Sequence, residues 1–146
     1  MSSDIKLILT VNSVIDNLND AGMPDGEPEI NIFTTDGTIS SSDGGYLLSF
    51  TEEQDGGKAH TALYIKEGVV RLVKSGAITS EMHFSEGEIF NTLYCVGPYS
   101  FDMTVRTRRI RNTLTTDGGE LQLIYSMNVG GQEKSVRMKI SAKKAR

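Results

Sequence analysis

The sequence contains few of the residues that form covalent cross-links, chain kinks or metal sites. Among 146 residues there are one cysteine, three prolines, two histidines and no tryptophan. The single cysteine, Cys95, excludes an intramolecular disulfide, which is typical of proteins from a reducing compartment. Two histidines and one cysteine do not have the spacing of zinc ligands. The sequence therefore predicts neither a metal nor another cofactor.

Long hydrophobic segments are also missing. No apolar run approaches the roughly 18 residues that a membrane-spanning helix needs. The first four residues, MSSD, lack the positive and apolar regions of a signal peptide. We therefore expect a cytoplasmic protein with no membrane partner. A length of 146 residues suits a single domain, residues 1–146, with a core of its own.

Glycine is abundant, with 15 residues, and most glycines stand in short turn signals. Asp-Gly and Gly-Gly pairs between apolar segments are strong hairpin signals, because tight hairpin turns need positive φ angles. Most of the signals are about ten residues apart, which is the spacing of strands joined by tight turns. They stand at residues 25–26, 36–37, 43–45, 55–57, 67–68, 75–76, 86–87, 97–98, 117–119 and 130–131.

The segments between these turns alternate between apolar and polar residues. Residues 121–129 place Leu121, Leu123 and Tyr125 on one face and Gln122 and Ser126 on the other. A strand with one buried face and one solvent-exposed face is typical of an antiparallel sheet. An open sheet of about ten strands would leave two exposed edges, which closure removes. The fold class predicted is therefore all-β, an antiparallel closed barrel of about 8–10 strands. Its last strand would pair with its first, and a two-sheet sandwich is the alternative.

Several of these turn and core segments resemble the YwiB-like β-barrel family, a bacterial domain of unknown function in the calycin superfamily. The resemblance covers nearly the whole chain. It rests on residues 43–53 (DGGYLLSFTEE), 61–68 (TALYIKEG), 76–87, 98–107, 118–125 and 138–140. It implies a calycin-like, lipocalin-like barrel, in which related proteins hold small apolar ligands at the mouth. The chain departs from the lipocalin signature, which has a Gly-x-Trp on the first strand, so no ligand cavity and no functional residue follow from the resemblance.

Charge is divided unevenly along the chain. Residues 1–105 carry 5 Lys and Arg against 16 Asp and Glu, a net −11, whereas residues 106–146 carry 10 against 3, a net +7. One explanation is a basic surface for an anionic partner. The explanation that we favour is that acidic early strands pair with basic late strands across a closed sheet.

The basic half contains an arginine-rich segment, Arg106-Thr107-Arg108-Arg109-Ile110-Arg111. Strict alternation from Val105 would turn Arg109 and Arg111 inward, where unpaired charge is very costly. One extra residue near Thr107–Arg109, a β-bulge, would instead turn Ile110 inward and leave all four arginines in solvent. The pattern therefore predicts a bulge and an external arginine ridge.

Candidate catalytic groups are few. His60 and His83 fall on strand faces opposite better apolar sets, so both are expected to face solvent. Cys95, in an apolar stretch, is expected to be a buried small hydrophobe. Glu52 and Glu53 are adjacent and cannot face one substrate, so we expect both at a solvated strand end.

Three hypotheses on function remain. The first is a non-enzymatic protein that binds a small, partly apolar molecule in the barrel interior or mouth, with Tyr64, Tyr94 and Tyr99 as candidate residues because tyrosine joins an apolar body to a polar tip. The second is a module that binds a polyanion such as RNA. Its candidate residues are Arg106, Arg108, Arg109, Arg111, Lys143, Lys144 and Arg146. The third is an enzyme with a carboxylate or tyrosine mechanism. Oligomeric state does not follow from the sequence.

Overall fold

The structure is a computed structural model that describes residues 4–54 and 57–145. It contains ten strands and, within those residues, no helix that is long and apolar enough to cross a membrane. The strands are β1 (Ile5–Asn17), β2 (Glu29–Ser42), β3 (Gly45–Gln54), β4 (Gly57–Lys66), β5 (Val69–Gly76), β6 (Ile78–Ser85), β7 (Ile89–Val96), β8 (Tyr99–Asn112), β9 (Gly118–Val129) and β10 (Gln132–Lys144).

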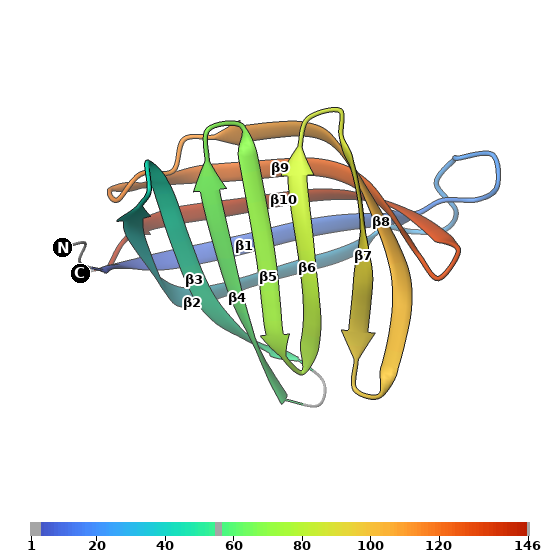
Figure 1. Ribbon diagram of the computed structural model, residues 1–146, viewed down its shortest axis with the longest axis horizontal. Coiled ribbons are helices and arrows are strands. Elements are labelled where there is room, and N and C mark those ends of the chain that lie inside the picture. Colours follow the sequence, from blue (N-terminus) through green and yellow to red (C-terminus); the bar gives the residue numbers. More distant parts are fainter. Residues whose placement is uncertain (1–3, 55–56, 146) are drawn as a thin grey trace.

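All ten strands form one closed antiparallel barrel, as the alternation and the turn spacing predict. Each strand pairs with its neighbours in the chain, and β10 closes the barrel by pairing with β1 from Leu7↔Lys144 to Asn17↔Lys134. The sandwich alternative is therefore wrong. In Figure 1 the strands β4, β5 and β6 cross the direction of β1, β2, β9 and β10, so the two halves of the wall face each other at a steep angle.

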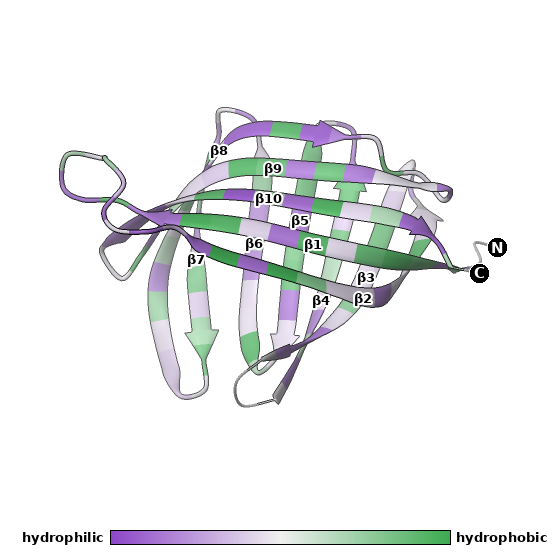
Figure 2. Cartoon of the chain, turned by 180° about the vertical axis from the view of Figure 1, so that it is seen from behind, coloured by the Kyte–Doolittle hydropathy of each residue, from purple (hydrophilic) through white to green (hydrophobic). Residues whose placement is uncertain are grey.

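The apolar side chains that alternate along the strands point into the barrel and form its core. Figure 2 shows this alternation as green and purple bands along β9 and β10. Leu7, Leu63, Leu72 and Leu123 are completely or almost completely buried, and Phe84 packs on Tyr125 with ring centroids 4.7 Å apart. Burial of a side chain of this size stabilises a fold by about 1.5–3 kcal/mol. This packed region positions the polar side chains described below.

Strand β8 contains the predicted bulge. The pairing register with β9 shifts between Thr107 and Arg109, so that Thr107 opposes Tyr125 and Arg109 opposes Ile124. Thr107 points inward, and Arg108 and Arg109 both lie on the outside. The β6–β7 turn holds the bulge in place: Gly87 N–H donates to the Thr107 carbonyl (2.9 Å), and Ile110 N–H donates to Glu86 Oε2 (2.9 Å).

The Thr107 hydroxyl gives a test of this support, because it accepts a hydrogen bond from Ser85 N–H at 3.3 Å. Thr107→Val keeps the shape of the side chain and leaves that N–H without an acceptor, so we expect the free energy of unfolding to fall by about 1 kcal/mol. Urea unfolding measures the change. Thr104→Val on the same strand removes an exposed bond to Asn91 (2.9 Å) and serves as the control. An equal loss in both variants would contradict a special role for Thr107.

The inward face of β8 is buried only in part, and the expectation that Cys95 is a buried small hydrophobe is wrong. Tyr99 and Phe101 share the inward face of β8 with Met103, yet both are exposed, because the β7–β8 hairpin extends beyond the packed interior. Cys95 lies on the outer face and is only half-buried, with its Sγ 3.4 Å from Ser100 Oγ. The apolar run around Cys95 does not lie wholly inside, because Leu93 is also exposed on the outside.

Candidate functional site

A row of polar side chains crosses the inner face of the barrel wall. Thr61 on β4 is paired with Lys74 on β5, Lys74 with Ser80 on β6, and Ser80 with Tyr94 on β7. Paired residues of neighbouring strands point to the same face, and Thr61 lies between the buried Ala59 and Leu63 on the inward side. All four side chains therefore point into the barrel.

Glu52 completes this inner polar row, which we define as Glu52, Thr61, Lys74, Ser80 and Tyr94. It follows Leu48 and Phe50 on the inward face of β3. Its Oε1 lies 3.1 Å from Lys74 Nζ, and the two side chains are only 11% and 21% exposed. An ion pair with so little exposure is stabilising only when both partners are present, because either charge alone would be costly in an apolar surrounding.

Tyr94 lies next to this ion pair. Burial raises the pKa of the Tyr94 phenol above its ordinary value, and the negative charge of Glu52 raises the pKa further. Both effects keep the phenol protonated, so Tyr94 presents a neutral hydroxyl as a hydrogen-bond donor or acceptor. Burial has the same effect on the pKa of Tyr125, which packs deeper in the barrel.

Two hydroxyls of the row have no hydrogen-bond partner among the described residues. Thr61 and Ser80 are 2% and 4% exposed, and neither Thr61 Oγ1 nor Ser80 Oγ is within bonding distance of a protein donor or acceptor. A buried hydroxyl without a partner costs about 1–3 kcal/mol. Unpaired polar groups at such depth are typical of places where water or a ligand completes the hydrogen bonds.

The position of Glu52 corrects the expectation that Glu52 and Glu53 both lie at a solvated strand end. Glu53 is exposed, but Glu52 points inward and pairs with Lys74. The sequence did contain a signal for this arrangement. Glu52 shares the parity of Leu48 and Phe50, and Lys74 shares the parity of Leu72. Opposite charges at inward positions of nearby strands indicate an internal ion pair.

The outer wall carries a groove over β1 to β5, with a volume of about 630 Å³, and its lining also includes Thr61 of the inner polar row. Its lining includes Lys6, Asp36, His60 and Tyr64, and the His60 Nδ1 lies 2.9 Å from Thr51 Oγ1. His60 is exposed, as expected, and so is Tyr64. The groove has room for a small molecule, but its outward polar side chains face water and do not need a ligand to satisfy them.

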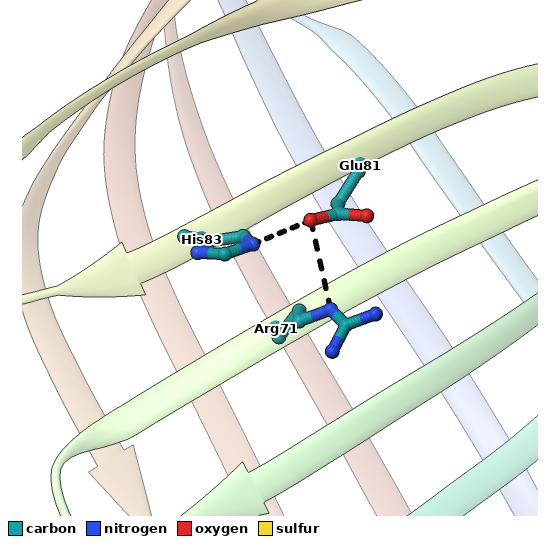
Figure 3. A network of polar contacts seen from close by, with 3 residues as sticks. All are labelled: Arg71, Glu81 and His83. Atoms are coloured by element: carbon teal, nitrogen blue, oxygen red, sulfur yellow. Dashed lines mark hydrogen bonds and ion pairs between the residues drawn. The ribbon is translucent and has the colours of Figure 1, made fainter.

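A network on the outer faces of β5 and β6 joins Arg71, Glu81 and His83 (Figure 3). Glu81 Oε2 lies 2.6 Å from His83 Nε2 and 3.6 Å from Arg71 Nε. The face of the His83 ring stacks on Phe90 at a centroid distance of 4.2 Å. The Arg71 guanidinium lies over the ring of Tyr64, 4.9 Å from its centroid. His83 faces outward, as expected. Within the described chain no hydroxyl or thiol is hydrogen-bonded to the His83 ring.

The three tyrosines proposed from the sequence lie in different places and do not form one site. Tyr94 belongs to the inner polar row, Tyr64 faces outward in the groove at 42% exposure, and Tyr99 lies at the β7–β8 hairpin at 66% exposure. Their proposed role in ligand binding stays a prediction. The described residues include no group of three or more His, Cys, Asp or Glu side chains that could hold a metal ion.

The arginine ridge lies on the outside, as predicted. Arg106, Arg108, Arg109 and Arg111 are all exposed, and Ile110 is half-buried against the core. Lys143 and Lys144 at the end of β10 are also exposed, whereas Arg146 lies outside the described residues.

In the part of the chain that the structure describes, the acidic side chains of residues 1–105 do not form the expected ion pairs with the basic side chains of residues 106–146. Each ion pair found in the described residues joins partners within the same half of the chain, including Lys139–Glu120 (3.0 Å) and Lys144–Asp117 (2.9 Å) in the basic half. The expected pairing of early acidic strands with late basic strands is therefore wrong. The reason lies in the topology: among the early strands only β1 borders β10, and β1 carries few acidic residues.

Comparison with known proteins agrees with the barrel. The chain is 28% identical over 134 residues to the uncharacterized beta-barrel protein YwiB of Bacillus subtilis (strain 168), covering 92% of this chain and 89% of that protein. It also superposes on the crystal structure of the ywiB protein from Bacillus subtilis with a TM-score of 0.86 and 26% identity, over 98% of this chain and 94% of the other.

A family model described as a domain of unknown function, DUF1934, matches residues 19–140. That match begins after the end of β1 and includes all of β2 to β9 and most of β10. The inner polar row and the arginine ridge both lie inside it. Because the matched residues make up most of the sequence, the chain belongs to the DUF1934 family of YwiB-like β-barrel proteins.

Proposed function

We propose that the protein is a non-enzymatic binding protein that holds a small, partly apolar molecule in the interior or mouth of its barrel, with the polar end of that molecule on the inner polar row. The observation that supports this proposal is the pair of buried hydroxyls, Thr61 Oγ1 and Ser80 Oγ, without partners among the described residues. Ligand sites in small proteins combine mostly apolar walls with a few convergent polar groups. The calycin-like mode of binding and a cytoplasmic location form part of the same proposal.

The charge of the row favours a neutral polar group over an ionised one. Glu52 and Lys74 neutralise each other at 3.1 Å, and the Tyr94 phenol is protonated. An anion would be repelled by Glu52, and a cation by Lys74. A hydroxyl or carbonyl group can instead form hydrogen bonds with Thr61, Ser80 and Tyr94 without placing another charge beside Glu52 or Lys74. The ligand class proposed is therefore a neutral molecule with an apolar body and an alcohol or carbonyl head.

The outer groove is a second candidate site, because its volume of about 630 Å³ has room for such a molecule. The inner row is preferred because only its hydroxyls are both buried and unpaired. Tyr64 is the largest aromatic side chain of the groove and Tyr94 that of the row, so two tyrosine variants distinguish the sites.

The test uses three naphthalene probes that share one apolar body: 2-naphthol, 2-naphthoate and 2-naphthylmethylamine. The absence of tryptophan leaves the naphthalene emission free of tryptophan background. We expect 2-naphthol to bind most tightly. We expect Tyr94→Phe and Ser80→Ala each to weaken 2-naphthol binding about fivefold to tenfold, the effect of one lost hydrogen bond of about 1–1.4 kcal/mol.

Tyr64→Phe is the matched control and should leave the dissociation constant unchanged. Weaker binding in Tyr64→Phe with no change in Tyr94→Phe would move the site to the outer groove and overturn the proposal. Tightest binding of the naphthoate or of the amine would overturn the neutral ligand class.

A further inference from the structure

The outward side chains of β8 and β10 form a second feature that the inner polar row does not explain. The cationic face, as we define it, consists of Arg106, Arg108, Arg109, Arg111, Arg137, Lys139 and Lys143. The register aligns Arg109, Ile124 and Arg137 across β8, β9 and β10, and likewise Arg111, Gln122 and Lys139. Neighbouring strands are about 4.8 Å apart, so each row places two cations about 10 Å from each other across a neutral strand.

Most of these cations have no acidic partner. Lys139 pairs with Glu120 at 3.0 Å, but none of the ion pairs in the described chain involves an arginine of β8, Arg137 or Lys143. The Glu86 carboxylate lies near the bulge, where it accepts the Ile110 N–H at 2.9 Å. Like charges held close together repel one another, which disfavours such a cluster unless an anion binds to it.

The bulge places one more arginine on the surface and adds no side chain to the core. Thr107 and Ile110 point inward, and the two residues between them both lie outside. A strand with only one residue in that place would keep the same inward positions, so the extra residue supplies an additional arginine on the surface. Hydrogen bonds from the β6–β7 turn to Thr107 and Ile110 fix the backbone under Arg108 and Arg109.

A shallow groove of about 230 Å³ lies beside the cations on the same side of the barrel. Val14 and Ile124 supply apolar lining, and Asn12, Gln122 and Arg137 supply polar groups. Asn12 Oδ1 is buried and has no hydrogen-bond partner within the residues described. Amide side chains around an apolar floor suit the edge and the face of a nucleobase.

We propose that the cationic face binds single-stranded nucleic acid, with phosphates on the arginines and lysines and an unpaired base in the groove. Charge complementarity supports the backbone contacts, and the groove favours a single strand, because the base edges of a duplex are already hydrogen-bonded. The outward residues of β9 include no aromatic side chain, so binding depends more on charge than on stacking.

Fluorescence anisotropy of the full chain with labelled 12-nucleotide RNA and DNA single strands tests the proposal. About four phosphate contacts, each with a single-strand salt slope of about −0.7, predict about 50-fold weaker binding when salt rises from 50 to 200 mM. Binding that does not weaken with salt would overturn the proposal. Equal affinity for a duplex would overturn the single-strand assignment, and equal affinity for a polyglutamate peptide of matched length would show a surface for acidic proteins instead.

Two charge-reversal variants with the same net charge locate the site. Arg109→Glu with Arg111→Glu should weaken single-strand binding at least tenfold. Lys58→Glu with Lys66→Glu, two exposed residues on β4, should weaken it less than threefold. An equal loss in both variants would mean that only total charge matters and would overturn the site. If the arginine reversal fails to fold, as judged by circular dichroism, Arg109→Gln with Arg111→Gln replaces it.

A separate measurement tests whether a base binds in the groove. Asn12→Ala should change the order of affinity among poly-U, poly-C and poly-A strands and leave the salt slope unchanged, because the amide contacts a base and not a phosphate. An unchanged order of affinity would remove the groove from the site.

Discussion

Lys74→Met is expected to lower the free energy of unfolding by about 3 kcal/mol, among the largest effects of any charged residue in this protein. The methionine fills a similar volume, so the loss comes from Glu52, whose carboxylate remains inside the barrel without its partner at 3.1 Å. Removing one member of an enclosed ion pair typically costs 3–5 kcal/mol, and the partial exposure of this pair places it at the lower end. Urea unfolding followed by circular dichroism measures the change.

The double variant Glu52→Leu with Lys74→Met separates the ion pair from packing. It removes both charges, so most of the lost stability should return. Lys144→Met breaks an exposed pair with Asp117 (2.9 Å) and should cost less than about 1 kcal/mol. If Lys74→Met and Lys144→Met had equal effects, the Glu52–Lys74 pair would not be enclosed as the structure describes.

Gly119→Ala is expected to have an effect of similar size, about 3 kcal/mol, for a reason of backbone geometry. Gly119 has a φ of +128°, and a Cβ at this position would overlap the Thr113 carbonyl oxygen. That oxygen belongs to backbone, so the contact cannot be relieved by turning a side chain. A residue held in a sparsely populated backbone conformation costs about 1–3 kcal/mol before any steric overlap is added.

Gly131→Ala is the matched control for this prediction. Gly131 also has a positive φ, +91°, but a Cβ there would meet no atom within 4 Å. Its alanine variant should therefore show only the cost of the φ angle, about 1–2 kcal/mol. Equal losses in the two variants would show that the approach to Thr113 is not tight. Thermal unfolding of both proteins measures the difference.

The fold was predictable to a large extent because each level of the sequence points to the same answer. Glycine-bounded segments in which apolar and polar residues alternate predict antiparallel hairpins. The described chain forms ten strands in one closed antiparallel sheet. The bulge was also predictable, since Ile110 has the wrong parity in any regular strand that begins at Val105. When an apolar residue falls on the outward face by one position, the alternation itself shows that the strand contains an extra residue nearby.

The candidate site was only partly predictable. Tyr94 was selected for its chemistry, but Tyr64 and Tyr99 have the same chemistry and lie outside the packed interior. Lys74 and Glu52 were missed because charged residues near strand ends are usually solvated, and only their parity indicates that they point inward. The grouping of Thr61, Lys74, Ser80 and Tyr94 depends on the register of four strands. The hairpin turns fix that register, but the sequence locates each turn only to within about a residue.

The two proposed sites are independent of each other. The inner polar row comes from β3 to β7, whereas the cationic face comes from β8 and β10 with a groove edge on β1. A variant of one site should leave the other unchanged, so Ser80→Ala should retain its affinity for single strands, and Arg109→Glu with Arg111→Glu should retain its affinity for 2-naphthol.

The pairing of β1 with β10 has a consequence for how the protein forms during synthesis. Strand β1 is translated before the other nine strands, but its partner β10, which covers one edge of β1 and ends at Lys144, is translated after all of them. Until then β1 has β2 as its only neighbour in the sheet, and its other edge exposes unpaired N–H and C=O groups. The barrel therefore cannot close around its core until β10 has been translated. A nascent chain that stalls before β10 is the form most exposed to aggregation and to capture by a chaperone.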